Sequence, residues 1–169
     1  MADTVEKPRK RRSLGGWKFI VAIVLILGYS AAAAYGVMSD TSIRGLTAKT
    51  FSVSRYCTTQ PSSLKTLNYN VRGAIWTASS IQTSLSHLTF TLSVDGSAIG
   101  TNSQGDSSFA PGQSVPFNLV FTHPTLNPTT LPLSSRLVLT VSATVAAGLY
   151  SANEAASDST LQTFSSPGC

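Results

Sequence analysis

An uncharged apolar run near the N-terminus constrains this chain more than any other feature. From Phe19 to Val37 the sequence has 19 residues without a charge, close to the ~20 that a helix needs to cross about 30 Å of hydrocarbon. Its most apolar part, Phe19–Leu27, is the part that we expect to insert into a lipid bilayer. Trp17 and Tyr35 stand near the two ends of the run, where aromatic side chains favour the membrane interfaces. The sequence therefore predicts a transmembrane helix over 17–38 that acts as a signal anchor.

A secretory signal sequence is the alternative interpretation of the same run. A basic segment, a short apolar segment and a small-residue cleavage site follow one another in such signals, and Ala32–Ala34 is a suitable cleavage site. If cleavage occurs there, the protein is secreted instead of anchored.

Basic residues set the predicted orientation. A cluster of basic residues at positions 7–12 precedes the apolar run, and only Arg44 and Lys49 follow soon after it. The positive-inside rule therefore places residues 1–16 in the cytoplasm and the C-terminal domain outside. The residues that mark the topology are Lys7, Arg9, Lys10, Arg11 and Arg12.

The net charge of +5 belongs mainly to the N-terminal tail. Residues 19–169 carry six basic and five acidic residues, which leaves the domain beyond the helix at +1. A protein that binds nucleic acid needs a basic face that neutralises several phosphates, so we expect no nucleic-acid partner.

Beyond a linker at 39–46, an exported β-domain is predicted over 47–169, because apolar residues alternate with polar ones as in half-buried strands. The clearest alternating segments are 66–76, 88–94, 115–121 and 136–145, with weaker strands at 47–56 and near 161–164. The expected core residues are Leu88, Phe90, Leu92, Val94, Phe117, Leu119, Leu139 and Val141.

Turn signals separate these segments. Asp95-Gly96 directly follows an alternating run and predicts a tight β-hairpin, because glycine tolerates the positive φ of a type I′ turn. Residues 151–160 are expected to form at most one helical turn. Six or seven short strands with frequent turns predict a mainly β fold, an antiparallel immunoglobulin-like or fibronectin III-like β-sandwich after one transmembrane helix.

The order of these segments is similar to that of a known family. The succession LNYNVRGAIW, LTFTLSVDGSAIGTNSQGDSSFAPGQSVPFNLVF and RLVLTVSATV resembles the LEA14-like domain (water-stress and hypersensitive-response, LEA type 2) over about 65–164. The resemblance implies a β-sandwich on a single-pass anchor, with an envelope or stress-related role and no known catalytic act.

Few residues carry the chemistry that an active site needs. His87 and His123 are 36 positions apart and have no Cys, Asp or Glu at ligand spacing, so no metal site is predicted. We also expect no catalytic residue and no cofactor. Cys57 and Cys169 both fall in the exported domain, where disulfides persist, and are predicted to form a structural disulfide.

Two functions remain open at this point. The first is a non-enzymatic, membrane-anchored cell-surface module for binding, envelope stabilisation or stress protection, with the lipid bilayer and protein or glycan components of the envelope as partners. The second is a pilin-like subunit of an extracellular filament, which would self-associate through its apolar helix.

Overall fold

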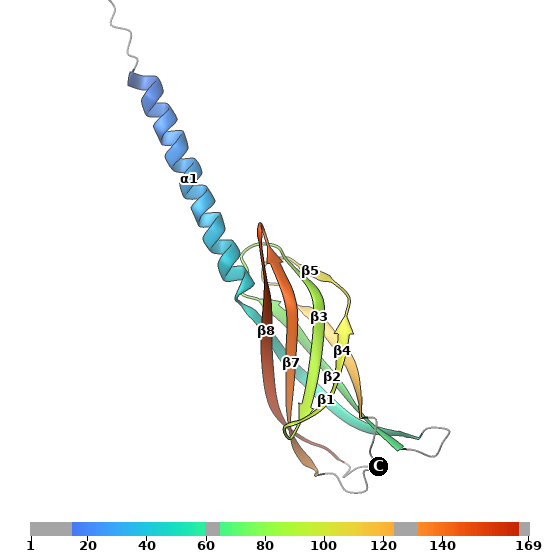
Figure 1. Cartoon of the computed structure of the whole chain (residues 1–169). Coiled ribbons are helices and arrows are strands. Elements are labelled where there is room, and N and C mark those ends of the chain that lie inside the picture. Colours follow the sequence, from blue (N-terminus) through green and yellow to red (C-terminus); the bar gives the residue numbers. More distant parts are fainter. Residues whose placement is uncertain (1–14, 60–64, 124–131, 166–169) are drawn as a thin grey trace, which may run out of the picture. The chain divides into compact units, whose positions relative to one another are not determined.

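The computed structural model describes residues 15–59, 65–123 and 132–165, and these form one helix and eight strands (Figure 1). In chain order they are α1 (Gly15–Ile43), β1 (Leu46–Thr59), β2 (Lys65–Thr77), β3 (Thr83–Val94), β4 (Ser97–Gln104), β5 (Ser107–Phe109), β6 (Val115–His123), β7 (Ser134–Ala147) and β8 (Tyr150–Thr163). The predicted fold class is confirmed: the protein is mainly β, with two antiparallel sheets packed as a sandwich after one long apolar helix. The chain divides into two compact units between Gly36 and Val37.

Helix α1 is apolar on every side and lies exposed along the part that belongs to the first unit. Ser30, Thr41 and Ser42 bond within the helix, as Ser30 Oγ does by donating to the carbonyl of Ile26 at 2.8 Å. Such a bond satisfies a hydroxyl where no water is present. The basic tail at 1–14, with Lys7 and Arg9–Arg12, lies outside the described residues.

The helix is longer than the sequence pattern indicated. It continues to Ile43, so most of the predicted linker at 39–46 is helical, and only Arg44 and Gly45 separate α1 from β1. The reason is tertiary: Ser39 and Ser42 are fully buried and Ile43 is 4% exposed, which places the last helical turn inside the sandwich unit. Ser42 Oγ lies 2.9 Å from Ser79 Oγ in the β2–β3 connection.

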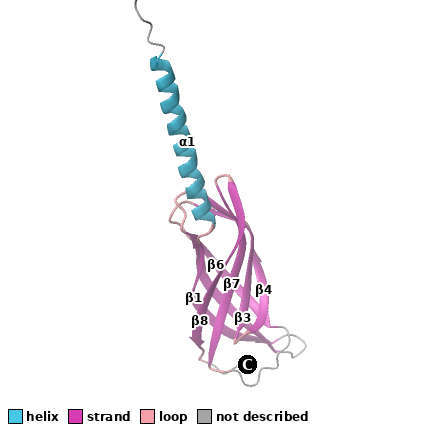
Figure 2. Cartoon of the chain, turned by 60° about the vertical axis from the view of Figure 1, so that its left-hand side comes forward, coloured by secondary structure: helices cyan, strands magenta, loops and turns pink. Residues whose placement is uncertain are grey.

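The strands form two sheets, seen from a second direction in Figure 2. One sheet has the order β1-β2-β6, and the other has the order β4-β3-β7-β8, with β5 also paired to β3. All the pairs are antiparallel. Each sheet has one apolar face, and the two sheets bury these faces against each other.

The alternation of apolar and polar residues in the sequence corresponds closely to the side chains that face the core and those that face the outside of the sandwich. The residues at every second position of β6, from Val115 to Phe121, are buried, and β7 follows the same pattern. All eight expected core residues are at most 8% exposed. Strand β3 departs from strict alternation at a bulge between Ser86 and Thr89, where His87 has a φ of 53°.

Phe117 links the two sheets at the centre of the core. It lies opposite Gly73 of β2, and its ring is 5.0 Å from the ring of Phe90 in the other sheet. A Cβ added to Gly73 would stand 2.4 Å from Phe117 Cζ and 2.2 Å from the carbonyl oxygen of Lys49. Gly73 is thus the position that admits the ring, in the way that an aromatic residue covers a glycine on a neighbouring strand.

Strand β8 corrects the prediction of a helical turn at 151–160. Those residues are extended and pair with β7 in continuous register from Ala147↔Tyr150 to Ser134↔Thr163. Alanine and glutamate favour helices, but the apolar strand β7 offers a complete row of backbone partners, and this tertiary context overrides a weak local preference. Ala152 and Ala156 pack against the core from this strand.

Side chains from one sheet reach the backbone of the other at both edges of the sandwich. Beside the β1 bulge, the backbone N–H of Thr50 donates to Asp158 Oδ2 of β8 at 2.6 Å. At the opposite edge, Asn102 Nδ2 of β4 donates to the carbonyl of Val120 in β6 at 3.3 Å. These contacts occupy edge groups that would otherwise be free to pair with another chain.

Replacing Gly73 by alanine tests the central packing. We expect Gly73→Ala to lower the free energy of unfolding by about 1–3 kcal/mol, because the added methyl group overlaps Phe117 and the backbone of β1. Urea unfolding of the full chain in detergent, followed by circular dichroism, measures the change. Gly100→Ala is the matched control, since nothing lies within 4 Å of a Cβ there. Equal effects of the two substitutions would contradict the role given to Gly73.

Candidate functional site

The end of the sandwich that holds the β3–β4 turn contains a cluster of polar and aromatic side chains. Arg55 of β1 places its guanidinium carbon 4.2 Å from the centre of the Phe164 ring and donates through Nη1 to the carbonyl of Pro132 at 3.1 Å. The Phe164 ring also meets Tyr69 edge-on, with 6.1 Å between ring centres. An arginine against an aromatic face is a favourable arrangement, and here it joins β1 to the end of the described chain.

Tyr69 is a buried member of this cluster, and its acidity is changed. It is 2% exposed, and burial raises the pKa of its phenol above the usual 10.0. A hydrogen bond and the positive charge of Arg55 act in the opposite direction and do not cancel the effect of burial. The phenol therefore stays neutral at physiological pH and acts as a hydrogen-bonding group.

A hollow of about 200 Å³ opens beside this cluster. Its apolar wall comes mainly from Leu67, Val94 and Ile99. Polar groups also line it: Tyr69, Asp95, Ser97, His123 and Ser135. The hollow thus combines apolar walls with several polar groups, and a binding site for a small molecule or a side chain also brings both kinds of group together.

The carboxylate and backbone of Asp95, beside this hollow, are occupied in ways that serve the fold. Asp95 and Gly96 form the two-residue turn between β3 and β4, with φ of 50° and 84°. The Asp95 carboxylate accepts the backbone N–H of Arg136 at 2.8 Å, and the Asp95 N–H donates to the Arg136 carbonyl at 2.8 Å. His123 Nδ1 is buried with no hydrogen-bond partner. Within the described residues, the hollow thus lacks the base–orienter bond that an activated nucleophile requires.

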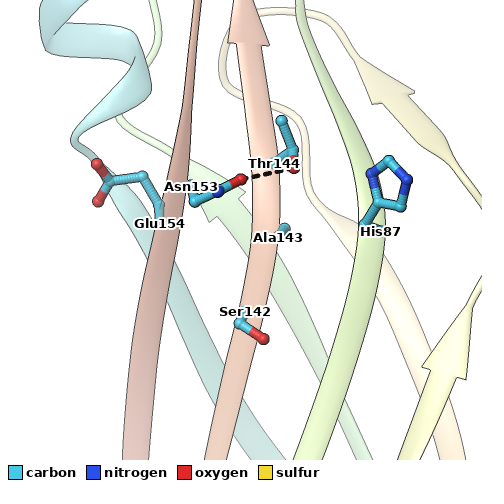
Figure 3. Close-up of a pocket in the computed structure, with 6 residues that line it drawn as sticks. All are labelled: His87, Ser142, Ala143, Thr144, Asn153 and Glu154. Carbon is cyan, nitrogen blue, oxygen red and sulfur yellow. Dashed lines mark hydrogen bonds between the residues drawn. The ribbon is translucent and has the colours of Figure 1, made fainter.

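A second hollow, of about 290 Å³, lies on the outer face of the β3-β7-β8 sheet (Figure 3). His87 stands at one side of it, at the β3 bulge, and Asn153 accepts a hydrogen bond from Thr144 Oγ1 at 2.8 Å. Figure 3 shows that Glu154 points away from His87, on the far side of β8. These side chains do not converge on one point.

The structure separates the other candidates that the sequence offered. His87 lies on β3 and His123 at the end of β6, in different sheets. Among residues 15–59, 65–123 and 132–165, no group of three His, Cys, Asp or Glu side chains is placed to hold a metal ion. Glu154 and Asp158 lie on the same face of strand β8.

Sequence reasoning missed the Arg55–Tyr69–Phe164 cluster, although one signal for it was present. Arg55 has the same strand parity as Val53, so it points to the core side of β1, opposite Tyr69. A charged residue at a strand position whose side chain faces the core indicates that an interaction partner lies beside it. Its aromatic partner, Phe164, lies 109 residues away in the chain, and no local pattern identifies it.

The cysteines remain a prediction. Cys57 lies near the end of β1, opposite Leu67, and is not a free thiol. Cys169 lies outside the described residues, so the predicted bond between Cys57 and Cys169 is not tested by the structure.

Comparison with known proteins gives a distant structural match. No family model matches the chain, and no curated protein does. The structure is similar to the crystal structure of a protein from Archaeoglobus fulgidus, with 9% sequence identity and a TM-score of 0.39, over 68% of this chain and 97% of that chain.

The acidity of Tyr69 gives a pH-dependent prediction. Because its pKa is raised in the folded state, its contribution to stability is complete below pH 10.0 and is lost as the pH rises through the folded-state value. We therefore expect the stability difference between the wild type and Tyr69→Phe to be constant up to about pH 9 and to shrink above pH 10. Urea titrations at a series of pH values measure it, and parallel curves for the two proteins throughout the alkaline range would contradict the assignment.

The disulfide gives a second prediction. The intact mass of the full-length protein should rise by two hydrogen atoms on reduction, and Cys57→Ser should lower the free energy of unfolding by at most about 4.7 kcal/mol, the loop-entropy value for a loop of about 100 residues. Mass spectrometry and urea unfolding provide the two measurements. If denatured, unreduced protein reacts with a thiol reagent at Cys57, the disulfide is wrong.

Proposed function

We propose that this protein is a single-pass membrane protein that displays a non-enzymatic, LEA14-like β-sandwich on the extracytoplasmic side. Its N-terminus lies in the cytoplasm, α1 is a signal anchor, and the sandwich serves as a binding module of the cell envelope with a stabilising or stress-protective role. Its partners are the bilayer and protein or glycan components of the envelope.

The observation that carries the proposal is the uncovered apolar surface of α1. The stretch Gly16–Ile43 is long and apolar enough to cross a membrane, and no residue in its most apolar part is buried. A signal sequence can be equally long and apolar. The large side chains along it, from Trp17 to Met38, are between 40% and 81% exposed. Apolar area of this extent is stable only when another apolar phase covers it, and a bilayer is such a phase.

Two features favour a retained anchor over a cleaved signal. The helix continues without interruption past Ala32–Ala34 to Ile43. Beyond that site, Tyr35, Val37 and Met38 are still 44%, 65% and 47% exposed. Cleavage would therefore leave an exposed apolar stub on the mature protein, whereas retention places these residues at the membrane boundary.

The outer face of the larger sheet supports a role outside the cell. Rows of hydroxyl residues run across it, for example through Thr91, Thr140 and Ser157, which are neighbours in register. Hydroxyls bind water without titrating, so such a face responds little to changes of salt or acidity. The hollow at the Asp95 end then offers the most structured place for a ligand or a partner side chain.

Membrane extraction tests the anchor. We expect the full chain to stay in the pellet after alkaline carbonate extraction with its N-terminal segment intact, and externally added protease to reach the sandwich in whole cells. Val24→Lys combined with Leu27→Lys places two charges in the span, at about 2.5–3.5 kcal/mol each near the helix centre, and should release the protein.

Leu161→Lys is the control for that pair, since it adds a charge to an exposed position of β8 and leaves the span unchanged. A mature protein that begins near Tyr35 and appears in the soluble fraction would overturn the anchor. Protection of the sandwich from external protease until detergent is added would overturn the orientation.

A pilin-like filament is the second candidate, because the core of a helical fibre also covers an apolar helix. Negative-stain electron microscopy of material sheared from cells separates the two functions. Fibres that contain this chain would favour the filament, and single domains in detergent with no fibres would exclude it.

A further inference from the structure

The β7–β8 hairpin ends in two exposed apolar residues that the fold does not require. Leu149 is 89% exposed, the highest value among the large apolar residues described, and Tyr150 is 51% exposed. Gly148 has a φ of 61° and Leu149 has no positive φ, which is the pattern of a type II′ turn with glycine first. The second position of such a turn accepts polar residues well, so the turn itself does not explain a leucine there.

This hairpin lies at the end of the sandwich where the chain enters from the helix. Leu46, the first residue of β1, pairs with Thr77 at the end of β2. Strand β3 then starts at Thr83, which pairs with Ala147 beside the hairpin turn. The hairpin tip and the start of β1 are therefore at the same end of the sandwich, as both views show (Figures 1 and 2).

Two other connections at this end are uncharged, whereas the α1–β1 connection carries Arg44, which pairs with Asp40 of α1 at 3.2 Å. Residues 78–82 read ASSIQ and residues 110–114 read APGQS, and neither contains a charged side chain. The opposite end carries Arg55, Asp95 and Arg136. Connections without charges can approach a membrane interface without removing ions from water.

The length of chain between the span and the sandwich brings this end close to the bilayer. Only Met38–Gly45 separate the uncharged run from the start of β1, and Met38–Ile43 are helical. Six helical residues rise about 9 Å, which is comparable to the 5–8 Å or so of headgroup region on each side of the hydrocarbon. Because Ser39, Ser42 and Ile43 are buried in the sandwich unit, this short connection is held by packing.

We propose that the tip of the β7–β8 hairpin is a second membrane contact, in which Leu149 and Tyr150 enter the interface of the same bilayer that α1 spans. Leucine supplies the apolar contact, and tyrosine has the amphipathic ring that is enriched at the level of the headgroups. The inference rests on the proposed anchor. Together, the helix and the hairpin would hold the sandwich at two points and limit its rotation on the membrane.

Fluorescence quenching by lipid tests this contact in the full-length protein. A Trp17→Phe background leaves Trp76 as the native tryptophan in every sample, and a reporter is added as Leu149→Trp. The matched control is Leu161→Trp, at a position that is 73% exposed and pairs with Arg136 at the opposite end of β8. Each protein is placed in phosphatidylcholine nanodiscs with and without bromine on the acyl chains.

We expect the emission from the Leu149→Trp reporter to fall in brominated nanodiscs and to resist quenching by iodide in the buffer. The Leu161→Trp reporter should show the reverse behaviour. Emission from Leu149→Trp that ignores brominated lipid and falls with iodide would overturn the inference, and so would protection from both quenchers, which indicates a protein partner at the tip. Co-elution of each variant with the nanodisc checks the anchor separately, so that failure of the anchor is distinguished from failure of the hairpin contact.

Discussion

The structure depends on the contact between the inner faces of two antiparallel sheets, and Phe117 is the residue that joins them most directly. Its ring occupies the space that the missing side chain of Gly73 leaves and meets Phe90 of the facing sheet. Protein interiors are closely packed, so a change in the volume of one side chain displaces the side chains around it. The positions of β2, β3 and β6 are thus coupled through one aromatic ring, and the loops at both ends of the sandwich are held by strands that this contact fixes.

The edges of the two sheets are the second feature on which the sandwich depends. Asp158 accepts the Thr50 N–H at one edge, while Asn102 and Gln104 donate to β6 carbonyls at the other. An open edge is a template for pairing with another chain, and side-chain caps remove it without adding a strand. This arrangement fits a domain that is displayed singly, and it is also compatible with assembly through the helix alone.

The two ends of the sandwich differ in their chemistry. The end where the chain enters carries the exposed apolar residues Leu149 and Tyr150 on a hairpin, whereas the other end holds Arg55, Arg136 and a small hollow lined in part by Asp95. A domain on a short membrane connection has one end near lipid and one end that is free to meet partners. We propose lipid for the first end, where Leu149 and Tyr150 are exposed, and envelope components for the second.

The sequence by itself determined the apolar helix, the alternating strands and the face of each strand that is buried, because helix length and period-two burial are local properties of the chain. It also indicated the Asp95-Gly96 turn, since a positive φ is a local demand. Tertiary structure alone decided that 151–160 is a strand, that the helix continues to Ile43, and that Arg55 meets Phe164. Each of these depends on partners far away in the chain, and their contribution to the free energy exceeds the weak local preference that a sequence pattern reports.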